Sequence, residues 1–207
     1  MFDFQQEKNI VLKFYEALDS AGPGEVEGVL KGAVVADYIW RGFYPFDVHT
    51  SSASVASSFW DPLKTSLSSL QRRMDIFFAG RNQMDDYSSV WVVSMGHLTG
   101  LFDAPWLGIA PTRKITMLRY AEFNRIIDGK IAETAMYFDI PHLMMQAGLT
   151  PFPPQTGEQL VQPGPMTHDG LLFGPQPAAE GEKTRDAINA MITDLGQWDS
   201  GMGLEDE

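Results

Sequence analysis

Two long strand-like segments joined by a two-residue turn constrain the fold of this chain more than any other feature. Residues 114–126 and 130–138 are rich in β-branched and aromatic side chains, and an Asp-Gly pair at 128–129 separates them. Asp-Gly is typical of a type I′ turn, in which both central residues take positive φ. Because so short a turn also sets the register of a hairpin, Ile127 is predicted to lie opposite Lys130.

Counting back from this turn places Glu122 opposite Ala135 and Tyr120 opposite Tyr137. Glu122, Tyr120 and Tyr137 then share one face of the hairpin, together with Glu133, provided that no bulge intervenes. A carboxylate in an apolar cavity has a raised pKa that suits proton transfer. The alternative is a strand carboxylate on a solvated face or paired with a neighbouring arginine.

The chain places helices first and most of its strands later. Helices are predicted over 5–21, where Val11, Phe14, Tyr15 and Leu18 recur at helical spacing, and over 25–30 and 51–60. A further helix is predicted to begin at Asp61-Pro62, with Asp61 as its N-cap, and to continue through Leu70. Strands are predicted over 34–40, 72–79, 88–99 and the hairpin, and Met74, Ile76 and Phe78 are expected on one face of the strand at 72–79. This order favours an α+β fold over alternating βαβ units. We expect a curved antiparallel sheet, bent by bulges, that wraps around the N-terminal helices to form a cone with an internal pocket.

The composition changes after the hairpin. Seven of the 13 proline residues lie between 151 and 177, which argues against a helix or a central strand there. We expect a cone domain at 1–149, a Pro-rich extended arm at 150–181, and a terminal helix with an acidic tail at 182–207. Apolar residues in the arm indicate that it packs on its own domain or on a partner subunit. The sequence leaves open whether the chain is a piece of a longer protein.

Composition limits the function classes. The net charge of −12 argues against nucleic acid and anionic membrane surfaces as partners, and no run approaches the roughly 20 apolar residues of a membrane span. The chain has no cysteine and no signal-peptide pattern, which fits a cytoplasmic protein. The four histidines lie far apart and no phosphate-binding loop occurs, so we expect neither a metal nor a cofactor.

Three sequence blocks carry a family resemblance. They are Gly-Ile-Ala-Pro-Thr at 108–112, Glu-Phe-Asn-Arg-Ile-Ile-Asp-Gly-Lys-Ile at 122–131, and Asp139 followed by Leu-Met-Met-Gln-Ala-Gly at 143–148. The chain resembles the SnoaL-like polyketide (ester) cyclase family of the nuclear transport factor two-like superfamily. The resemblance implies a cystatin-like α+β barrel, cofactor-free chemistry on a small hydrophobic molecule, and a homodimer that pairs through the convex face of the sheet.

The chain departs from the family pattern at the catalytic positions. The family's general acid/base aspartate falls on Met136, and its assisting histidine falls on Glu122. Trp40 and Tyr120 occupy two further positions where the family has polar residues. Because a methionine cannot move a proton, the cyclase mechanism does not carry over unchanged, and Glu122 remains as an acid/base in a neighbouring place.

Glu122, His97 and Asp139 are the candidate catalytic residues. A neutral His97 imidazole on an apolar strand face suits a hydrogen bond to a substrate carbonyl or proton transfer, and the alternative is a core histidine bonded to backbone. Asp139 follows the last strand, where the resemblance places an aspartate at the start of the final helix. The mechanical alternative for Asp139 is an N-cap, with Pro141 in the first turn.

Large apolar side chains are candidates for lining a ligand pocket, with core packing as the alternative. They are Trp40, Tyr38, Trp60, Trp106, Tyr120, Met136 and Tyr137. We expect a protein that binds a hydrophobic carbonyl compound, with acid/base catalysis of a cyclisation, isomerisation or hydration. The alternative is a non-catalytic small-molecule-binding or dimerisation module of the same fold.

Overall fold

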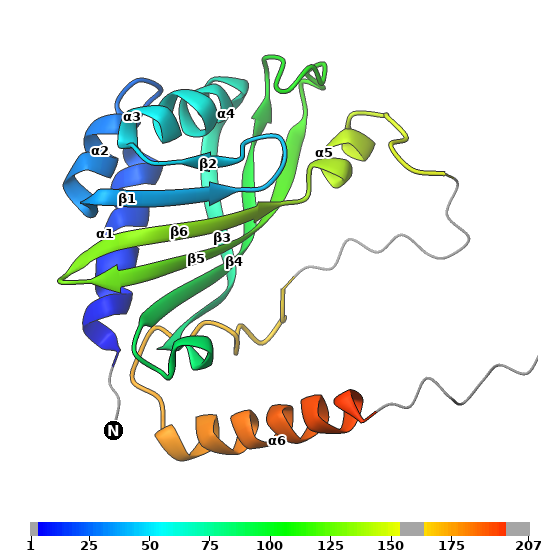
Figure 1. The fold of residues 1–207 in the computed structure, drawn as a ribbon. Helices are drawn as coiled ribbons and strands as arrows, with labels where there is room; N and C mark the ends of the chain where they lie inside the picture. Colours follow the sequence, from blue (N-terminus) through cyan, green and yellow to red (C-terminus); the bar gives the residue numbers. More distant parts are fainter. Residues whose placement is uncertain (1–3, 154–163, 198–207) are drawn as a thin grey trace, which may run out of the picture. The chain divides into compact units, whose positions relative to one another are not determined.

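The computed structural model describes residues 4–153 and 164–197 and divides into two compact units. The larger unit, Phe4–Gly174, contains a six-stranded sheet with the order β2-β1-β6-β5-β4-β3 (Figure 1). The other unit contains the terminal helix α6 (Ala178–Gly196). Part of the predicted arm, 154–163, and most of the predicted acidic tail, 198–207, lie outside the described residues.

The elements of the larger unit follow the predicted order of helices before most strands. The helical segments are α1 (Gln5–Ser20), α2 (Val26–Ala33), α3 (Ser52–Val55), the π-helical turn η1 (Ala56–Trp60), α4 (Asp61–Ser66), the 3-10 turn η2 (Gln83–Asp85) and α5 (Ile140–Gln146). The strands are β1 (Val34–Gly42), β2 (Val48–His49), β3 (Leu67–Arg81), β4 (Val90–Phe102), β5 (Ile115–Ile127) and β6 (Lys130–Phe138).

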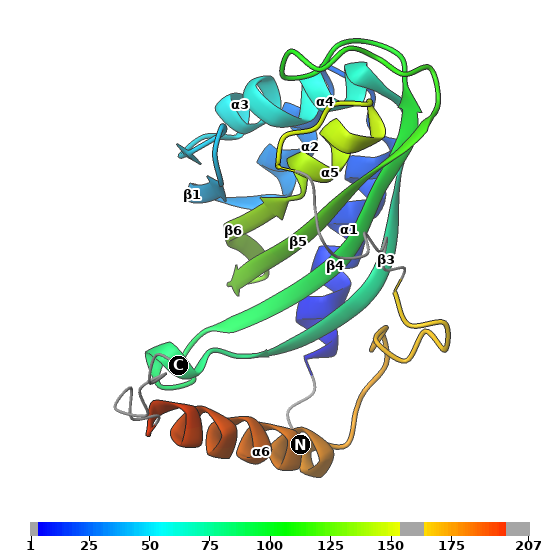
Figure 2. The same ribbon diagram turned by 90° about the vertical axis from the view of Figure 1, so that its right-hand side faces the viewer.

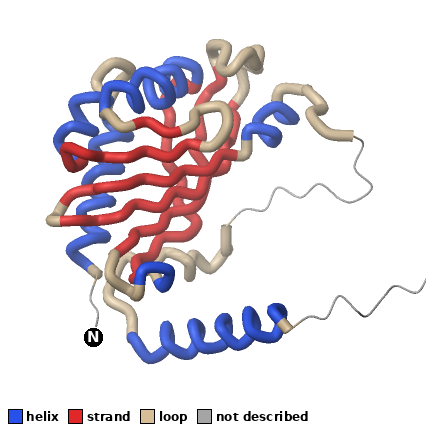
Figure 3. The backbone as a smooth tube through the Cα atoms, viewed as in Figure 1, coloured by secondary structure: helices blue, strands red, loops and turns tan. Residues whose placement is uncertain are grey.

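The predicted α+β class with a curved sheet is confirmed. The sheet bends around α1, α2, α3 and α4, which all lie on one face that we call the inner face (Figures 2 and 3). Adjacent strands pair antiparallel except β1 and β6, which are parallel, so the sheet is mixed. Among the described residues no helix has the length and apolarity needed to cross a membrane.

Helix α1 packs on the inner face through the residues that its periodicity predicts. Val11, Phe14, Tyr15 and Leu18 are buried there. Their spacing of three and four residues keeps them on one side of the helix. Tyr15 and the helix that carries it therefore lie directly over the strands of the sheet.

The predicted helix from Asp61 to Leu70 begins where expected, but Asp61 does not cap it and the helix ends earlier than predicted. Asp61 has helical dihedral angles and lies inside a continuous helical run, so it is not an N-cap, and its Oδ1 instead accepts a hydrogen bond from Gly24 N. The helix ends at Ser66, because Leu67 is extended and opens β3 opposite Phe102. Leu67 is buried in either arrangement, so the apolar spacing alone did not distinguish them.

A bulge in β3 also overturns part of the predicted alternation. The register with β4 shifts between Met74 and Ile76, which inserts Asp75 as an extra residue. Phe77 is therefore fully buried, whereas Phe78, predicted to share a face with Met74, is 39% exposed. Residues before the bulge keep the predicted faces and residues after it exchange them.

The hairpin turn is confirmed, but its register changes along the strands. Ile127 pairs with Lys130 as predicted, and a bulge then leaves Ala132 without a partner on β5. Glu122 lies opposite Met136, and not opposite Ala135; Tyr120 lies opposite Phe138, and not opposite Tyr137. The prediction that Tyr137 and Glu133 share the face of Glu122 is wrong for this reason.

The C-terminal segments resolve two further expectations. Leu171 forms a parallel bridge with Phe77, so the described end of the predicted arm lies along β3 of its own chain. Helix α6 begins before the predicted start at residue 182 and ends at Gly196, with Gln197 as its C-cap.

Candidate functional site

Glu122 lies in the middle of β5 on the inner face of the sheet. Ser94 of β4 and Met136 of β6 are its cross-strand neighbours. Only 1% of the Glu122 side chain is exposed. Glu122 is therefore buried on the face of the sheet that the helices cover, and a buried charge of this kind needs a partner.

Arg72 of β3 is that partner. Its Nη1 donates a hydrogen bond to Glu122 Oε2 at 2.7 Å, and its side chain is also only 1% exposed. Arg72 precedes the β3 bulge and so points to the inner face, across β4 from Glu122. The two opposite charges compensate each other in the interior.

Three aromatic rings surround the Arg72 guanidinium. Its Cζ lies 3.8 Å from the ring centroid of Tyr15, 4.7 Å from that of Tyr120 and 5.9 Å from that of Trp60. Burial lowers the pKa of Arg72 and Glu122 raises it, and the net direction is well above the usual arginine value. The guanidinium is thus a permanent buried cation in an aromatic cage.

Neutral polar groups complete the cluster. Asn124 Nδ2 donates to Glu122 Oε1 at 3.2 Å and to the Tyr15 hydroxyl at 3.1 Å. Thr134 Oγ1 donates to Asn124 Oδ1 at 2.7 Å, which fixes the amide orientation. Both carboxylate oxygens of Glu122 therefore accept hydrogen bonds from the protein.

The phenols of this cluster stay protonated. Desolvation raises the pKa of Tyr15 well above its usual value, with Glu122 adding to the shift, and desolvation likewise raises the pKa of Tyr120. The Tyr120 hydroxyl lies 2.8 Å from Ser94 Oγ. We use the term inner cluster for Arg72 and Glu122 with Tyr15, Tyr120, Asn124, Thr134 and Ser94.

Arg72 has donors beyond those that the protein satisfies. Its Nε and Nη2 are buried and make no hydrogen bond in the structure. The nearest opposite charge to Nε is Asp19 Oδ1, at 3.9 Å, too far for a hydrogen bond. Desolvation raises the pKa of Asp19, while Arg72 opposes that shift. Unsatisfied buried donors are rare in native proteins, and each calls for an explanation such as a catalytic role or a bound water or ion.

The predicted pocket-lining residues separate into two groups. Six belong to the buried core around the inner face: Tyr38, Trp40, Trp60, Trp106, Tyr120 and Met136. Tyr137 is 45% exposed and lies on the opposite, outer face, stacked on Phe43 with ring centroids 3.9 Å apart. The β6 bulge is the cause of this separation.

His97 does not join Glu122. It lies on the outer face of β4, where its Nδ1 is 3.2 Å from Asp75 Oδ2. Desolvation lowers the pKa of His97, Asp75 raises it, and the net direction is below the usual histidine value. Glu122 and His97, the two leading candidates, therefore lie on opposite faces of the sheet.

Asp139 is the N-cap of α5. Its Oδ1 accepts a hydrogen bond from His142 N at 3.0 Å, with Pro141 at the start of the helix. Asp139 therefore has the capping role that the sequence analysis gave as the alternative to catalysis. Asp139 follows Phe138, beyond the Tyr120 end of the inner cluster.

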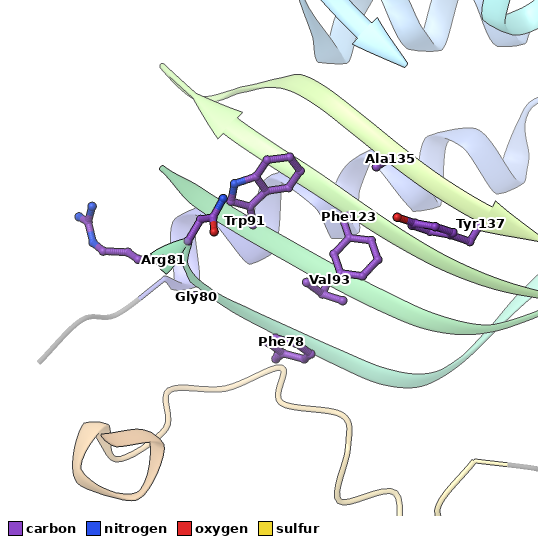
Figure 4. Close-up of a pocket in the computed structure, with 9 residues that line it drawn as sticks. Phe78, Gly80, Arg81, Trp91, Val93, Phe123, Ala135 and Tyr137 are labelled. Carbon is purple, nitrogen blue, oxygen red and sulfur yellow. The ribbon is translucent and has the colours of Figure 1, made fainter. Parts of the chain in front are cut away.

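The outer face carries an aromatic pocket of about 360 Å³ (Figure 4). It is lined by Phe78, Gly80, Arg81, Asn82, Trp91, Val93, Phe123, Ala135 and Tyr137. These residues come from four strands, β3 to β6, and the adjoining turn. The predicted site residues contribute only Tyr137 to it.

The sequence prediction missed five residues of the inner cluster: Arg72, Tyr15, Asn124, Thr134 and Ser94. A signal for Arg72 was present, because alternation placed it on the apolar face with Met74. The contact between Arg72 and Glu122 spans 50 residues of sequence, and it depends on strand order. No group of three metal-ligating side chains occurs within the described ranges.

Solved structures share this fold. A protein described as a SnoaL-like polyketide cyclase, from Jannaschia sp. CCS1, matches with a TM-score of 0.54 and 17% identity, over 73% of this chain and 95% of that chain. AclR from Streptomyces galilaeus, described as a hydroxylase, matches with a TM-score of 0.55 and 19% identity, over 72% and 89%. An NTF2-like protein from Burkholderia thailandensis E264 matches with a TM-score of 0.50 and 18% identity, over 72% and 98%.

No family model and no curated protein sequence matches the chain. The chain has the fold of SnoaL-like polyketide cyclases and NTF2-like proteins, and the predicted resemblance is confirmed at the level of the fold. At identities of 17–19% the likeness establishes architecture alone. Because one fold hosts many activities, function has to be argued from the inner cluster.

Proposed function

We propose that this protein binds a small hydrophobic carbonyl compound at the inner cluster and promotes its enolisation. The observation that carries the proposal is the pair of buried Arg72 nitrogens, Nε and Nη2, that make no hydrogen bond. A carbonyl oxygen is an acceptor that satisfies such donors, and the surrounding aromatic core suits an apolar ligand body.

The proposed step uses Glu122 as the proton acceptor. A C–H bond next to the carbonyl breaks, the proton passes to Glu122, and the electron pair forms an enolate whose oxygen faces Arg72. A fixed cation at the developing oxyanion stabilises this charge in a site of low dielectric. Each carboxylate oxygen has two lone pairs, so one on each remains beside the bonds from Arg72 and Asn124.

The role assigned here is narrower than the one that the sequence indicated. His97 lies on the outer face and Asp139 caps α5, so neither supports proton transfer at Glu122. Enolisation is a step that cyclisation and isomerisation of carbonyl compounds have in common. We therefore propose the reaction class and leave the substrate to the experiment.

The test is turnover of a panel of enolisable ketones and esters by wild type, Glu122→Gln and Glu133→Gln. Glu133 is a matched control, since it is a paired carboxylate on the outer side of β6. We expect Glu122→Gln to lower kcat by about 100-fold or more, the usual size of a general-base effect, while Glu133→Gln stays near wild type. Equal rates for all three proteins would leave the alternative, a non-catalytic module of this fold.

We further propose that two copies pair through the outer face. Phe78, Met95 and Tyr137 expose 37–45% of their surface there, beside the aromatic pocket. An exposed apolar patch of this kind commonly marks an interface. The resemblance described above implies the same pairing.

A further inference from the structure

The inner cluster is closed on the side where α1 crosses β3. The ring of Tyr15, from α1, lies against the guanidinium of Arg72, from β3, with 3.8 Å from Cζ to the ring centroid. Asp19, also from α1, has its Oδ1 3.9 Å from Arg72 Nε. A ligand that approaches Arg72 from this side therefore requires α1 to separate from β3.

A C-terminal segment runs along β3 at Phe77, beyond the bulge that follows Arg72. Phe77 N donates to Gly170 O and Leu172 N donates to Phe77 O, each at 2.8 Å. Because β3 is an edge strand of the sheet, residues 170–174 supply backbone partners that this edge otherwise lacks. The ring of Phe173 also lies 5.4 Å from that of Phe77.

The same segment holds α1. Lys8 Nζ donates to Leu172 O at 2.9 Å and to Gly174 O at 2.7 Å. Lys8 is only 5% exposed, so its charge depends on such acceptors. Lys8 and Tyr15 are seven residues apart and thus lie on the same side of α1.

The segment fits closely where it meets the β3 bulge. A Cβ added to Gly170 would lie 2.8 Å from Asp75 O and 3.2 Å from Ile76 Cγ1. A side chain at position 170 therefore pushes the segment away from the strand. Because of this close approach, a substitution at Gly170 breaks the contact between the segment and β3 without deleting any residue.

We propose that residues 170–174 form a strap that holds α1 against β3 and so controls access to the inner cluster. That a ligand binds at the inner cluster rests on the function proposed above. The effect of the strap on the opening of the inner cluster is measured without any ligand. Release of the strap removes two backbone hydrogen bonds from β3 and two carbonyl acceptors from Lys8. Helix α1 then loses a tie to the strand that carries Arg72, and the Tyr15–Arg72 contact opens more often.

The absence of cysteine from the sequence gives a clean reporter of this opening. Ser94→Cys places one thiol in the inner cluster, at a residue that is fully buried and beside the Tyr120 hydroxyl. Ala56→Cys places a thiol at another buried position, in η1. The rate of modification by a small disulfide reagent then measures how often each position becomes accessible.

The strap is weakened by Lys8→Met or, independently, by Gly170→Val, with Met166→Ala as a control at a side chain that is 91% exposed. We expect either strap variant to raise the modification rate of the S94C thiol by about tenfold or more, with little change for the A56C thiol or in the Met166→Ala background. Equal S94C rates in all backgrounds, or equal acceleration of both thiols, would overturn the strap. A failed turnover assay with a positive thiol result would reject the enolisation and keep the strap.

Discussion

Arg72 Nη1 lies 2.7 Å from Glu122 Oε2, and each of the two side chains is only 1% exposed. The pair joins β3 to β5 across the intervening β4 and brings helix α1 into the same contact through Tyr15. Arg72 and Glu122 thus place a charged pair within a core that is otherwise mostly apolar. The pair is costly to divide, because either charge alone would remain uncompensated in the interior.

The first prediction concerns this cost. Arg72→Met or Glu122→Leu alone is expected to lower the free energy of unfolding by about 3–5 kcal/mol, since each leaves one buried charge without its partner. The double variant is expected to lose clearly less than the sum of the two. Urea unfolding of all four proteins measures the coupling, and additive losses would contradict a tight interaction between the two residues.

The second prediction concerns pH and His97. Desolvation lowers the folded-state pKa of His97 below its usual 6.5, against the opposing influence of Asp75 and with smaller lowering effects of Arg119 and His142. The unfolded chain therefore binds the proton more readily, and stability is expected to fall as the pH drops below about 6.5.

Urea unfolding at about pH 7.5 and about pH 5.5 checks this effect in wild type and His97→Gln. The loss of stability at the lower pH should be smaller in His97→Gln, whereas His168→Gln, at an exposed loop histidine, should behave as wild type. The same loss in all three proteins would assign the pH dependence to other groups.

The third prediction separates capping from catalysis at Asp139. Asp139→Ala removes the acceptor for His142 N and is expected to cost about 1 kcal/mol of stability, while Asp139→Asn, which also caps well, should cost less. Neither variant should change kcat on a substrate that Glu122→Gln no longer turns over. A large fall in kcat for Asp139→Asn with unchanged stability would indicate that Asp139 takes part in the reaction.

The fourth prediction tests the outer face as an interface. Light scattering should give about twice the chain mass of 23.0 kDa for wild type and the monomer mass for Phe78→Lys or Tyr137→Lys. Tyr44→Lys is the control, because Tyr44 is 89% exposed outside the aromatic pocket. A monomeric wild type at micromolar concentration, or a Tyr137→Lys dimer, would reject this face.

The sequence predicted features that depend on neighbouring residues. The Asp-Gly turn placed Ile127 opposite Lys130 correctly, because a two-residue turn allows few registers. The spacing of Val11, Phe14, Tyr15 and Leu18 predicted the buried side of α1, because one helix face suffices to explain it. The α+β order followed from such local patterns.

The features that the sequence missed depend on distant contacts. Asp75 and Ala132 are extra residues in their ladders, and nothing in the alternating pattern reveals an inserted residue until the facing strand is known. The contact of Arg72 with Glu122 required the order of β3, β4 and β5 in the sheet. The buried position of Glu122 could thus be predicted, but its partners could not.

The bulge at Ala132 has a consequence for how this chain tolerates changes in length. Glu133 already pairs with Arg125, so loss of Ala132 would leave every later pair of β6 in place. Loss of one residue between Glu133 and Met136 would instead turn either Glu133 or the Tyr137 phenol to the buried side, according to which pairs the strand keeps. Deletion of Ala132 is therefore expected to leave the sheet intact, whereas deletion of one residue between Glu133 and Met136 is expected to disrupt it.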